Sequence, residues 1–339
     1  MTPPGTLVDV NTPAPIGVEF DDLALETSVR SVLRQVEDLL RESVVNEDEF
    51  VSGAASYLVD AGGKRFRPLV TALAGHFGDA TRPEIVAAAV VVELTHLATL
   101  YHDDVMDEAT VRRGAPSPNA RWDNTVAILT GDFLFSRASN LLADLGPYAV
   151  RLQARTFERL VIGQIHETVG PPPGADPIEH YLGVLADKTG SLIATAAEFG
   201  AHFAGADPAV TVALREYGEK IGVAFQLSDD ILDIASETGQ SGKTPGTDLR
   251  EGVATLPVLY ALRGAPEGRL QDLVARPVTD DGDHAEALGL LRSSDALDQA
   301  RATCRRYADR ARAALDGLPD SPARAAFEVL ADSVVTRTG

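Results

Sequence analysis

The stretch that decides the fold is residues 97–107, LATLYHDDVMD, which sets three aspartates at fixed spacing in an apolar helical run. Residues 223–233, VAFQLSDDILD, repeat the arrangement, so the chain contains Asp-Asp-x-x-Asp twice. On an α-helix the first and third aspartates of each set stack on one face, and the middle one lies beside them. The two stretches therefore predict two helices that each carry an acidic face.

Both acidic faces indicate a metal site. Carboxylates crowded in this way repel one another and cost helix stability unless a cation joins them. Mg²⁺ prefers oxygen ligands and is usually held by one or two carboxylates together with phosphate oxygens. A solvated acidic surface is the alternative, but apolar residues flank both sets, which a face made for water would not require. The pattern predicts a divalent metal and a diphosphate ligand.

Composition restricts the kinds of partner. The 339 residues are 45% hydrophobic, enough for a substantial core. A net charge of −20 argues against nucleic acid or an anionic membrane surface, since both would be repelled. The single cysteine, Cys304, allows no internal disulfide, and neither a signal pattern nor an uninterrupted apolar run of about 18 residues is present. We expect a cytoplasmic protein that attracts diphosphates through local cations and metal ions.

The rest of the chain predicts an all-α fold. Residues 1–20 are rich in proline and predict a disordered N-terminal lead. Apolar spacing then predicts helices at about 22–44, 48–60, 66–78, 82–107, 124–145, 148–168, 178–203, 208–237, 254–263, 284–292, 296–317 and 321–336. No alternating strand pair stands out, and no Gly/Pro break is long enough for an interdomain linker. We expect residues 21–339 to form one domain, a bundle of ten or more helices around a deep central cavity, with the aspartate sets facing each other across it.

Basic residues occur at two places that suit a diphosphate. Residues 62–68, GGKRFRP, place three cations on a glycine turn before a helix. Glycine permits a conformation that bares backbone N–H groups, and arginine offers forked donors that match phosphate oxygens. A surface charge cluster is the alternative. Arg112 and Arg113 follow the first aspartate set by five residues, so cations and metal would grip one diphosphate from two sides.

Together these motifs resemble the all-trans isoprenyl diphosphate synthases, also called polyprenyl synthetases, from about residue 30 to the end. The matching motifs are residues 62–68, 93–107 (ELTHLATLYHDDVMD), 112–114 (RRG), 131–132 (GD), 188–190 (KTG), 225–233 (FQLSDDILD) and 242–257 (GKTPGTDLREGVATLP). The resemblance implies an isoprenoid synthase fold and Mg²⁺-dependent head-to-tail condensation of isopentenyl diphosphate with an allylic diphosphate, farnesyl or geranylgeranyl diphosphate. It also implies a homodimer.

The resemblance assigns roles to individual residues. The expected catalytic residues are the six aspartates and Lys188, and the expected Mg²⁺ ligands are Asp103, Asp104, Asp107, Asp229 and Asp230, with Asp233 in support. Those implied to contact the allylic substrate are Arg112, Lys188, Thr189, Gln226 and Lys243. Those implied to hold isopentenyl diphosphate are Lys64, Arg67, His96 and Arg113.

Two positions depart from the family pattern, and a third residue, His102, could be mistaken for a metal ligand. The family often has lysine where this chain has Val253, which removes one cationic contact to the allylic diphosphate. The family often has an aspartate shortly after the position of Gln164, for which Glu167 is a substitute here. His102 adjoins Asp103, but Mg²⁺ prefers oxygen, so we expect a structural role for this histidine.

Product length depends on the residues below the first aspartate set. Short-product members of the family tend to carry Phe or Tyr four or five residues before the first aspartate, whereas this chain has Ala98 and Thr99. We expect a deep tunnel and a product from hexaprenyl to decaprenyl, suited to a menaquinone or ubiquinone side chain. Phe133, Phe135 and Phe157 offer an alternative floor, which would end the product at farnesyl or geranylgeranyl diphosphate.

Two other functions share some of these features. A class I terpene cyclase has a similar bundle, but typically replaces the second aspartate set with another metal motif and lacks the residue 62–68 motif. A regulatory subunit of a heteromeric synthase tends to have lost carboxylates, whereas all six are present here. Transient membrane contact through a lipophilic product is compatible with the synthase.

Overall fold

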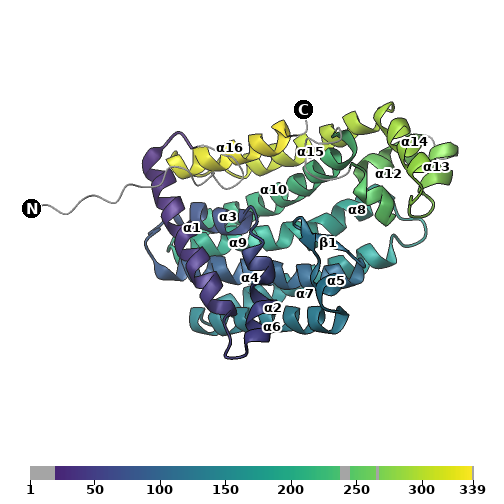
Figure 1. The fold of residues 1–339 in the computed structure, drawn as a ribbon. Coiled ribbons are helices and arrows are strands. Elements are labelled where there is room, and N and C mark those ends of the chain that lie inside the picture. The colour runs from purple at the N-terminus through teal and green to yellow at the C-terminus, as the bar shows by residue number, and fades with distance from the viewer. Residues whose placement is uncertain (1–19, 237–244, 265–266, 338–339) are drawn as a thin grey trace, which may run out of the picture.

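The computed structural model describes residues 20–236, 245–264 and 267–337, and these form an all-α bundle (Figure 1). Its helices are α1 (Leu23–Val44), α2 (Glu49–Asp60), α3 (Phe66–Gly75), α4 (Pro83–Met106), α5 (Pro118–Arg121), α6 (Asn124–Leu145), α7 (Pro147–Val169), α8 (Pro177–Leu185), α9 (Ser191–Phe203), α10 (Pro208–Ala235), α11 (Thr247–Glu251), α12 (Leu256–Gly264), α13 (Arg269–Val274), α14 (Asp281–Arg292), α15 (Ala296–Ala313) and α16 (Pro322–Thr336). A π-helical segment, Ala186–Gly190, joins α8 to α9. Two short strands, β1 (Val111–Arg112) and β2 (Ala115–Pro116), form an antiparallel hairpin.

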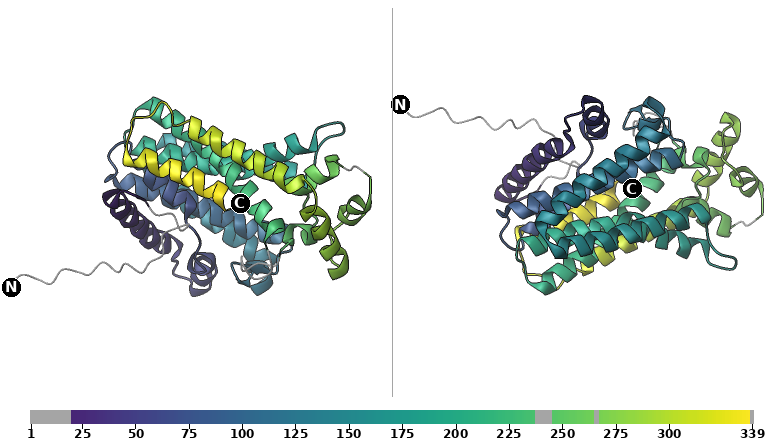
Figure 2. Two further views of the ribbon diagram at one scale, coloured as in Figure 1. Left: turned by 90° about the horizontal axis from the view of Figure 1, so that it is seen from above. Right: turned by 90° about the horizontal axis from the view of Figure 1, so that it is seen from below.

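The centre of the bundle is built from α3, α4, α9 and α10, with α9 packing on each of the other three. Helix α6 covers α4 on one side, and α15 and α16 cover α10 on the other (Figure 1). Figure 2 shows α1 at one flank of the bundle and α12–α14 at the opposite one. The aspartate helices α4 and α10 are therefore both held in the core, with packing partners on either side.

Glycines allow the central helices to approach closely. A Cβ atom on Gly200 of α9 would lie 2.1 Å from the Thr71 carbonyl oxygen of α3. A Cβ atom on Gly218 of α10 would lie 2.7 Å from Ala194 Cα of α9. Since any side chain at these positions would force the backbones apart, the two glycines fix the spacing of the layers that carry the site.

Helix starts follow from capping side chains. Carboxylate or hydroxyl oxygens accept hydrogen bonds from first-turn N–H groups, which otherwise have no partner within the helix. The capping residues are Asp22, Asp48, Asp123, Asp176, Asp207, Asp280 and Ser321. These caps explain why the predicted helix starts agree closely with the observed ones.

The predicted all-α class and helix count are confirmed, with differences in detail. The β1–β2 hairpin was not expected, and the helix predicted at 178–203 is interrupted by the π-helical segment. The short helices α5, α11 and α13 were missed because a few residues carry too little periodicity. The predicted lead at residues 1–20 lies, apart from residue 20, outside the described residues.

Helix α4 corrects the hydropathy analysis. It is long and apolar enough, by length and composition, to cross a membrane, although its apolar residues do not run without interruption. Within the bundle, 67% of its most apolar 18-residue window is buried. Its hydrophobicity is accounted for by a core position.

Candidate active site

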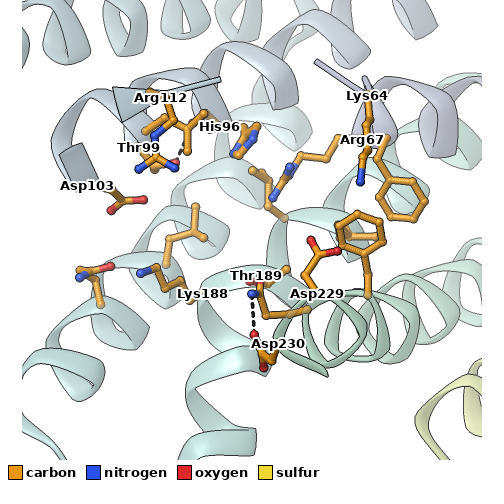
Figure 3. A pocket seen from close by; sticks show the side chains of 18 of the residues that line it. Lys64, Arg67, His96, Thr99, Asp103, Arg112, Lys188, Thr189, Asp229 and Asp230 are labelled. Carbon is orange, nitrogen blue, oxygen red and sulfur yellow. Dashed lines mark hydrogen bonds between the residues drawn. The ribbon is translucent and has the colours of Figure 1, made fainter. Parts of the chain in front are cut away.

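A cavity of about 600 Å³ lies where α3, α4, α7, α9 and α10 converge. Most of the residues singled out from the sequence line it, as Figure 3 shows for ten of them. Those lining it are Lys64, Arg67, His96, Thr99, Asp103, Arg112, Lys188, Thr189, Gln226, Asp229, Asp230 and Asp233. Asp104, Asp107, Arg113 and Ala98 are not among the lining residues, and Lys243 lies outside the described residues.

The first aspartate set divides between the cavity and the protein interior. Asp103 faces the cavity, and burial raises the pKa of its carboxyl to about 6. Asp104 is fully buried, and Arg112 from the hairpin contacts its Oδ1 through Nε at 2.6 Å and Nη2 at 2.5 Å. Asp107 is the C-cap residue of α4, and burial raises its pKa as well. Only Asp103 of this set is placed directly at the cavity wall.

The second set is held by three different contacts. Asp230 is buried and accepts hydrogen bonds from the Tyr181 hydroxyl and from Gln226 Nε2, the latter at 3.1 Å. Burial raises the pKa of Asp230 to about 7. Asp229 Oδ1 pairs with Arg337 Nη2 at 2.5 Å.

The third member of that set shapes the neighbouring loop. Asp233 accepts hydrogen bonds from the backbone N–H groups of Thr247 at 3.1 Å and Asp248 at 3.2 Å. The carboxylate of Asp233 thereby fixes the first turn of α11 at the rim of the cavity, beside Asp229 and Asp230.

The basic turn before α3 separates its cations. Lys64 and Arg67 line the cavity, on the side facing Asp229 (Figure 3). Arg65, in a left-handed conformation with φ 46°, turns into the core and contacts Glu37 Oε1 at 2.5 Å and Glu93 Oε1 at 3.0 Å. The sequence placed all three cations on one turn, and the structure shows that the middle one anchors it.

Arg113 supports the same turn from the other side. Its Nη1 donates to the carbonyl oxygen of Leu58 at 2.7 Å and also to that of Gly62. A Cβ atom on Gly63 would lie 3.0 Å from Arg113 Nη2, so glycine makes room for the guanidinium. In this structure Arg113 thus holds the backbone of the turn from outside the cavity wall.

His96 lies on α4 among these cations. Burial, and then the charges of Arg67 and Arg113, lower the pKa of His96 well below its ordinary value. The imidazole is therefore neutral near pH 7 and carries one N–H donor. It can donate a hydrogen bond to an anion without adding charge.

The π-helical segment directs Lys188 and Thr189 into the cavity. The Lys188 ammonium donates to the Glu167 carboxylate, and although burial opposes it, the charges of Asp103 and Glu167 raise the pKa of Lys188. A Cβ atom on Gly163 of α7 would lie 2.8 Å from the Lys188 backbone nitrogen. Gly163 therefore allows α7 to support this segment closely.

Sequence reasoning missed several residues at the site. Phe66 and Phe225 stack with ring centroids 4.9 Å apart, and the Arg337 guanidinium lies 5.0 Å from the Phe225 ring. Arg337 reaches the cavity from the end of α16, 108 positions after Asp229. No local pattern signals such a contact. Phe225 could have been found from the sequence, because it directly precedes Gln226 in a recognised motif.

Aromatic and aliphatic side chains form the wall of the cavity on the side of α6 and α7. Phe135 and Phe157 line the cavity in an edge-to-face pair, with centroids 4.6 Å apart. Thr99 lines it as expected. Ala98 is fully buried, and its carbonyl oxygen lies 3.1 Å from the position of a Cβ on Gly131 of α6, so Ala98 belongs to the α4–α6 packing. Two of the three aromatic residues considered from the sequence as an alternative floor, Phe135 and Phe157, therefore line the cavity.

The donor set fits a hard divalent cation. No three His, Cys, Asp or Glu side chains among the residues that the structure describes converge closely enough to hold a metal on their own. Mg²⁺ completes its shell with substrate phosphates, so an open half-site is what this ion requires. Asp104 Oδ2 is buried and without a hydrogen-bond partner, and Asp103 and Asp230 carry raised pKa values. Such carboxylates are stabilised by a bound cation.

Comparisons with known proteins agree with this arrangement. The model of the polyprenyl synthetase family matches residues 48–291. Nonaprenyl diphosphate synthase of Mycobacterium tuberculosis is 49% identical, covering 97% of this chain and 100% of the relative. Dimethylallyltranstransferase of the same organism is 41% identical, covering 94% and 98%. The crystal structure of geranylgeranyl pyrophosphate synthase from Corynebacterium glutamicum, complexed with calcium and isoprenyl diphosphate, has a TM-score of 0.85 and 48% identity, covering 95% and 100%.

Proposed function

Because the chain belongs to the polyprenyl synthetase family and is a prenyltransferase that makes trans-prenyl diphosphates, we propose that its product is a long chain, from hexaprenyl to decaprenyl diphosphate. The starter is farnesyl or geranylgeranyl diphosphate, extended by isopentenyl diphosphate. The protein works in the cytoplasm, and its lipophilic product passes to a membrane as a quinone side chain. The observation that carries the proposal is one cavity that joins both aspartate helices to the basic turn of α3.

The allylic diphosphate would lie between the two aspartate helices. Lys188, Thr189 and Gln226 line this part of the cavity and would donate to its oxygens, with Arg112 beside Asp104. Asp103, Asp104, Asp107, Asp229 and Asp230 are the proposed metal ligands, and Asp233 supports them by fixing the α11 turn. Bound Mg²⁺ supplies charge neutralisation for the departing diphosphate, which favours ionisation of the allylic carbon–oxygen bond.

Isopentenyl diphosphate would lie against the basic turn. Lys64 and Arg67 hold its diphosphate, and neutral His96 donates a further hydrogen bond. Arg113 acts by holding the turn in place. The double bond of isopentenyl diphosphate then attacks the allylic carbon, and a proton passes to the departing diphosphate. Phe66 and Phe225 cover this region and exclude water from the cationic carbon.

Both the wall of the cavity and the relatives bear on product length. Thr99 leaves room on α4, and the nonaprenyl synthase supports a long chain. The Phe135–Phe157 pair and the geranylgeranyl pyrophosphate synthase support a shorter one. We favour the long product because Thr99 lines the cavity near the position where short-product members of the family tend to carry an aromatic ring.

A homodimer is part of the proposal. Helices α6 and α7 pack on each other and carry exposed apolar side chains, including Ile128, Leu129, Ile162 and Ile165. Exposed apolar side chains on two neighbouring helices are typical of an interaction site. Sedimentation of the purified protein gives the mass, and a mass of one chain at micromolar concentration would contradict the dimer.

Product analysis tests the function. Purified protein is incubated with Mg²⁺, labelled isopentenyl diphosphate and, separately, dimethylallyl, geranyl, farnesyl or geranylgeranyl diphosphate. We expect a ladder that ends at a chain of six to ten isoprene units. Termination at farnesyl or geranylgeranyl diphosphate would reject the long product, and no elongation from any starter by folded protein would reject the synthase in favour of a cyclase or partner subunit. Asp229→Asn is expected to abolish elongation, whereas Asp316→Asn on the surface is expected to leave it unchanged.

A further inference from the structure

The π-helical segment Ala186–Gly190 carries two of the residues proposed to bind the allylic diphosphate, Lys188 and Thr189. Both line the cavity (Figure 3). π-Helices are rare in proteins, appear mostly as single turns inside α-helices, and are frequent at functional sites. Because the regular α-helix is so much more common, contacts from neighbouring helices have to favour the π-helical form here.

The π-helical form sets the direction of the side chains. In it the Ser191 N–H bonds to the carbonyl oxygen of Ala186, five residues earlier rather than four. The turn thus contains about one residue more than an α-helical turn. Since each residue of an α-helix turns by about 100°, a return to α-helical bonding would rotate Lys188 and Thr189 relative to one of the flanking helices. Both side chains would then leave the positions in which they line the cavity.

One face of α7 follows the segment along its length. Arg159, Gly163 and Glu167 are spaced four residues apart, so they lie on the same face of the helix. Arg159 Nε donates to Asp187 Oδ1 at 2.8 Å. A Cβ atom on Gly163 would lie 2.8 Å from the Lys188 backbone nitrogen, and Glu167 accepts from the Lys188 ammonium. Three successive turns of α7 therefore contact the segment.

Arg159 also joins α7 to α10. Its Nη1 contacts Glu219 Oε2 of α10 at 3.4 Å, and its Nη2 donates to the carbonyl oxygen of Ala186 at 3.4 Å. A guanidinium has five N–H donors in a fixed planar fork, so one side chain can serve all three contacts. Arg159 is half-buried and is not among the residues that line the cavity. Its effect on a substrate there would be indirect.

The contact of the segment with α10 is made by glycines. A Cβ atom on Gly190 would lie 3.0 Å from the carbonyl oxygen of Glu219, and one on Gly222 would lie 2.8 Å from Gly190 Cα. Close backbone contact sets the distance between the segment and α10. Without side chains it does little to fix the rotation of the segment, whereas the pairing of Arg159 with Asp187 does.

From these contacts we propose that Arg159 is a positioning residue for the condensation. By binding Asp187 and Ala186, it holds the π-helical segment in the rotation that directs Lys188 and Thr189 at the allylic diphosphate. This inference rests on the proposed synthase function and on the proposed roles of Lys188 and Thr189. The alternative is a stabilising ion pair with no effect on the site, but half-exposed pairs of this kind contribute little to stability.

Arg159→Ala tests the proposal in steady-state assays in which each substrate is varied in turn. A misplacement of about 1 Å can cost about 100-fold in rate, so we expect kcat/KM for the allylic diphosphate to fall at least about tenfold. The KM for isopentenyl diphosphate should stay within about twofold, because Lys64 and Arg67 lie on a different element. A merely structural loss would not separate the two substrates.

The control is Arg312→Ala. Arg312 joins α15 to α16 through Asp332, with a side chain about as exposed as that of Arg159, and neither partner lines the cavity. Its kinetics should equal those of the wild type. Arg159→Lys keeps the charge but lacks the fork that reaches several partners, and we expect it to recover part of the loss.

A double-mutant cycle tests whether Arg159 acts through Asp187. Asp187→Asn should also lower kcat/KM for the allylic diphosphate. The double variant should lose no more than the more affected single variant, because both substitutions break one contact. Losses that multiply would overturn the proposed route from Arg159 to the segment.

The outcomes separate this inference from the proposed function. Folded Arg159→Ala with unchanged kcat/KM for the allylic diphosphate, or with equal losses for both substrates, would overturn the positioning role and leave the synthase intact. Absence of condensation by the wild-type protein would instead reject the proposed function. If Arg159→Ala does not fold, Asp187→Asn decides, and wild-type kinetics of that variant would overturn the proposal.

Discussion

Replacing Asp230 by asparagine should stabilise the metal-free protein at high pH while removing activity. Asp230 is 3% exposed, and burial raises the pKa of its carboxyl to about 7. Tyr181 and Gln226 hydrogen-bond to it, but within the described ranges no cation pairs with it. Above pH 7 the folded protein therefore contains a buried carboxylate that the unfolded chain would solvate.

The sign and size follow from proton linkage. The unfolded carboxyl has a pKa near 3.8, so between about pH 4 and pH 7 the folded state holds a proton that the unfolded state has lost. Stability is thus fully present below pH 4 and falls as the pH rises through about 7. Roughly three pKa units at about 1.4 kcal/mol each give a loss of about 4 kcal/mol by pH 8. Asparagine cannot ionise and avoids this loss.

Urea denaturation of both proteins in EDTA, at intervals from pH 5 to pH 8.5, measures the effect. The free energy of unfolding of the wild type should fall relative to Asp230→Asn, and the difference should grow with pH and level off above pH 8. Asp316→Asn, at an exposed position, should run parallel to the wild type. A constant difference between the wild type and Asp230→Asn across this range would refute the assignment of a buried, protonated Asp230.

Two further substitutions have matched controls in the same chain. Arg65→Ala leaves the buried carboxylate of Glu93 without its cation and should lower the free energy of unfolding by about 3–5 kcal/mol. The control is Arg41→Ala: the exposed Arg41 side chain pairs with Glu37 at 3.5 Å, and its loss should cost at most about 1 kcal/mol. Equal losses in the two variants would contradict the anchoring role of Arg65. Gly163→Ala places a methyl group 2.8 Å from the Lys188 backbone nitrogen and should lower kcat at least tenfold in steady-state assays, because it shifts Lys188. The control is Gly183→Ala, whose methyl group meets nothing within 4 Å and should leave kcat unchanged. Unchanged kinetics of folded Gly163→Ala would show that α7 does not position the π-helical segment.

The aspartate helices could be predicted because their information is local. Three acids at positions i, i+1 and i+4 and their apolar flanks lie within about ten residues, so helix geometry alone places them. The caps of α1 and α2, Asp22 and Asp48, are local in the same way. Predictions of this kind depend on periodicity and short-range hydrogen bonds, and the structure confirms them.

The orientation of individual charges could not be predicted from such patterns. Lys64, Arg65 and Arg67 look alike in sequence, yet Arg65 faces the core because Glu37 and Glu93, from two other helices, lie there. Asp104 turns to Arg112, eight residues later in the β1–β2 hairpin, which the sequence did not predict. The contact of Arg337 with Asp229 also depends on helices that meet only after folding. Contacts between distant segments leave no periodic trace in one sequence.

Internal ion pairs explain how the site stays folded without its ligands. In the structure Asp104 pairs with Arg112, Asp229 pairs with Arg337, and the positive charge of Lys188 acts on Asp103. Protein cations therefore hold positions next to carboxylates that we propose as metal ligands. Asp230 lacks such a cation within the described residues, and it is the carboxyl whose pKa burial raises to about 7, so a proton neutralises it instead. Binding of Mg²⁺ and diphosphate would then exchange internal counter-charges and one proton for external ones, so a chain of net charge −20 can maintain two acidic helices at one cavity.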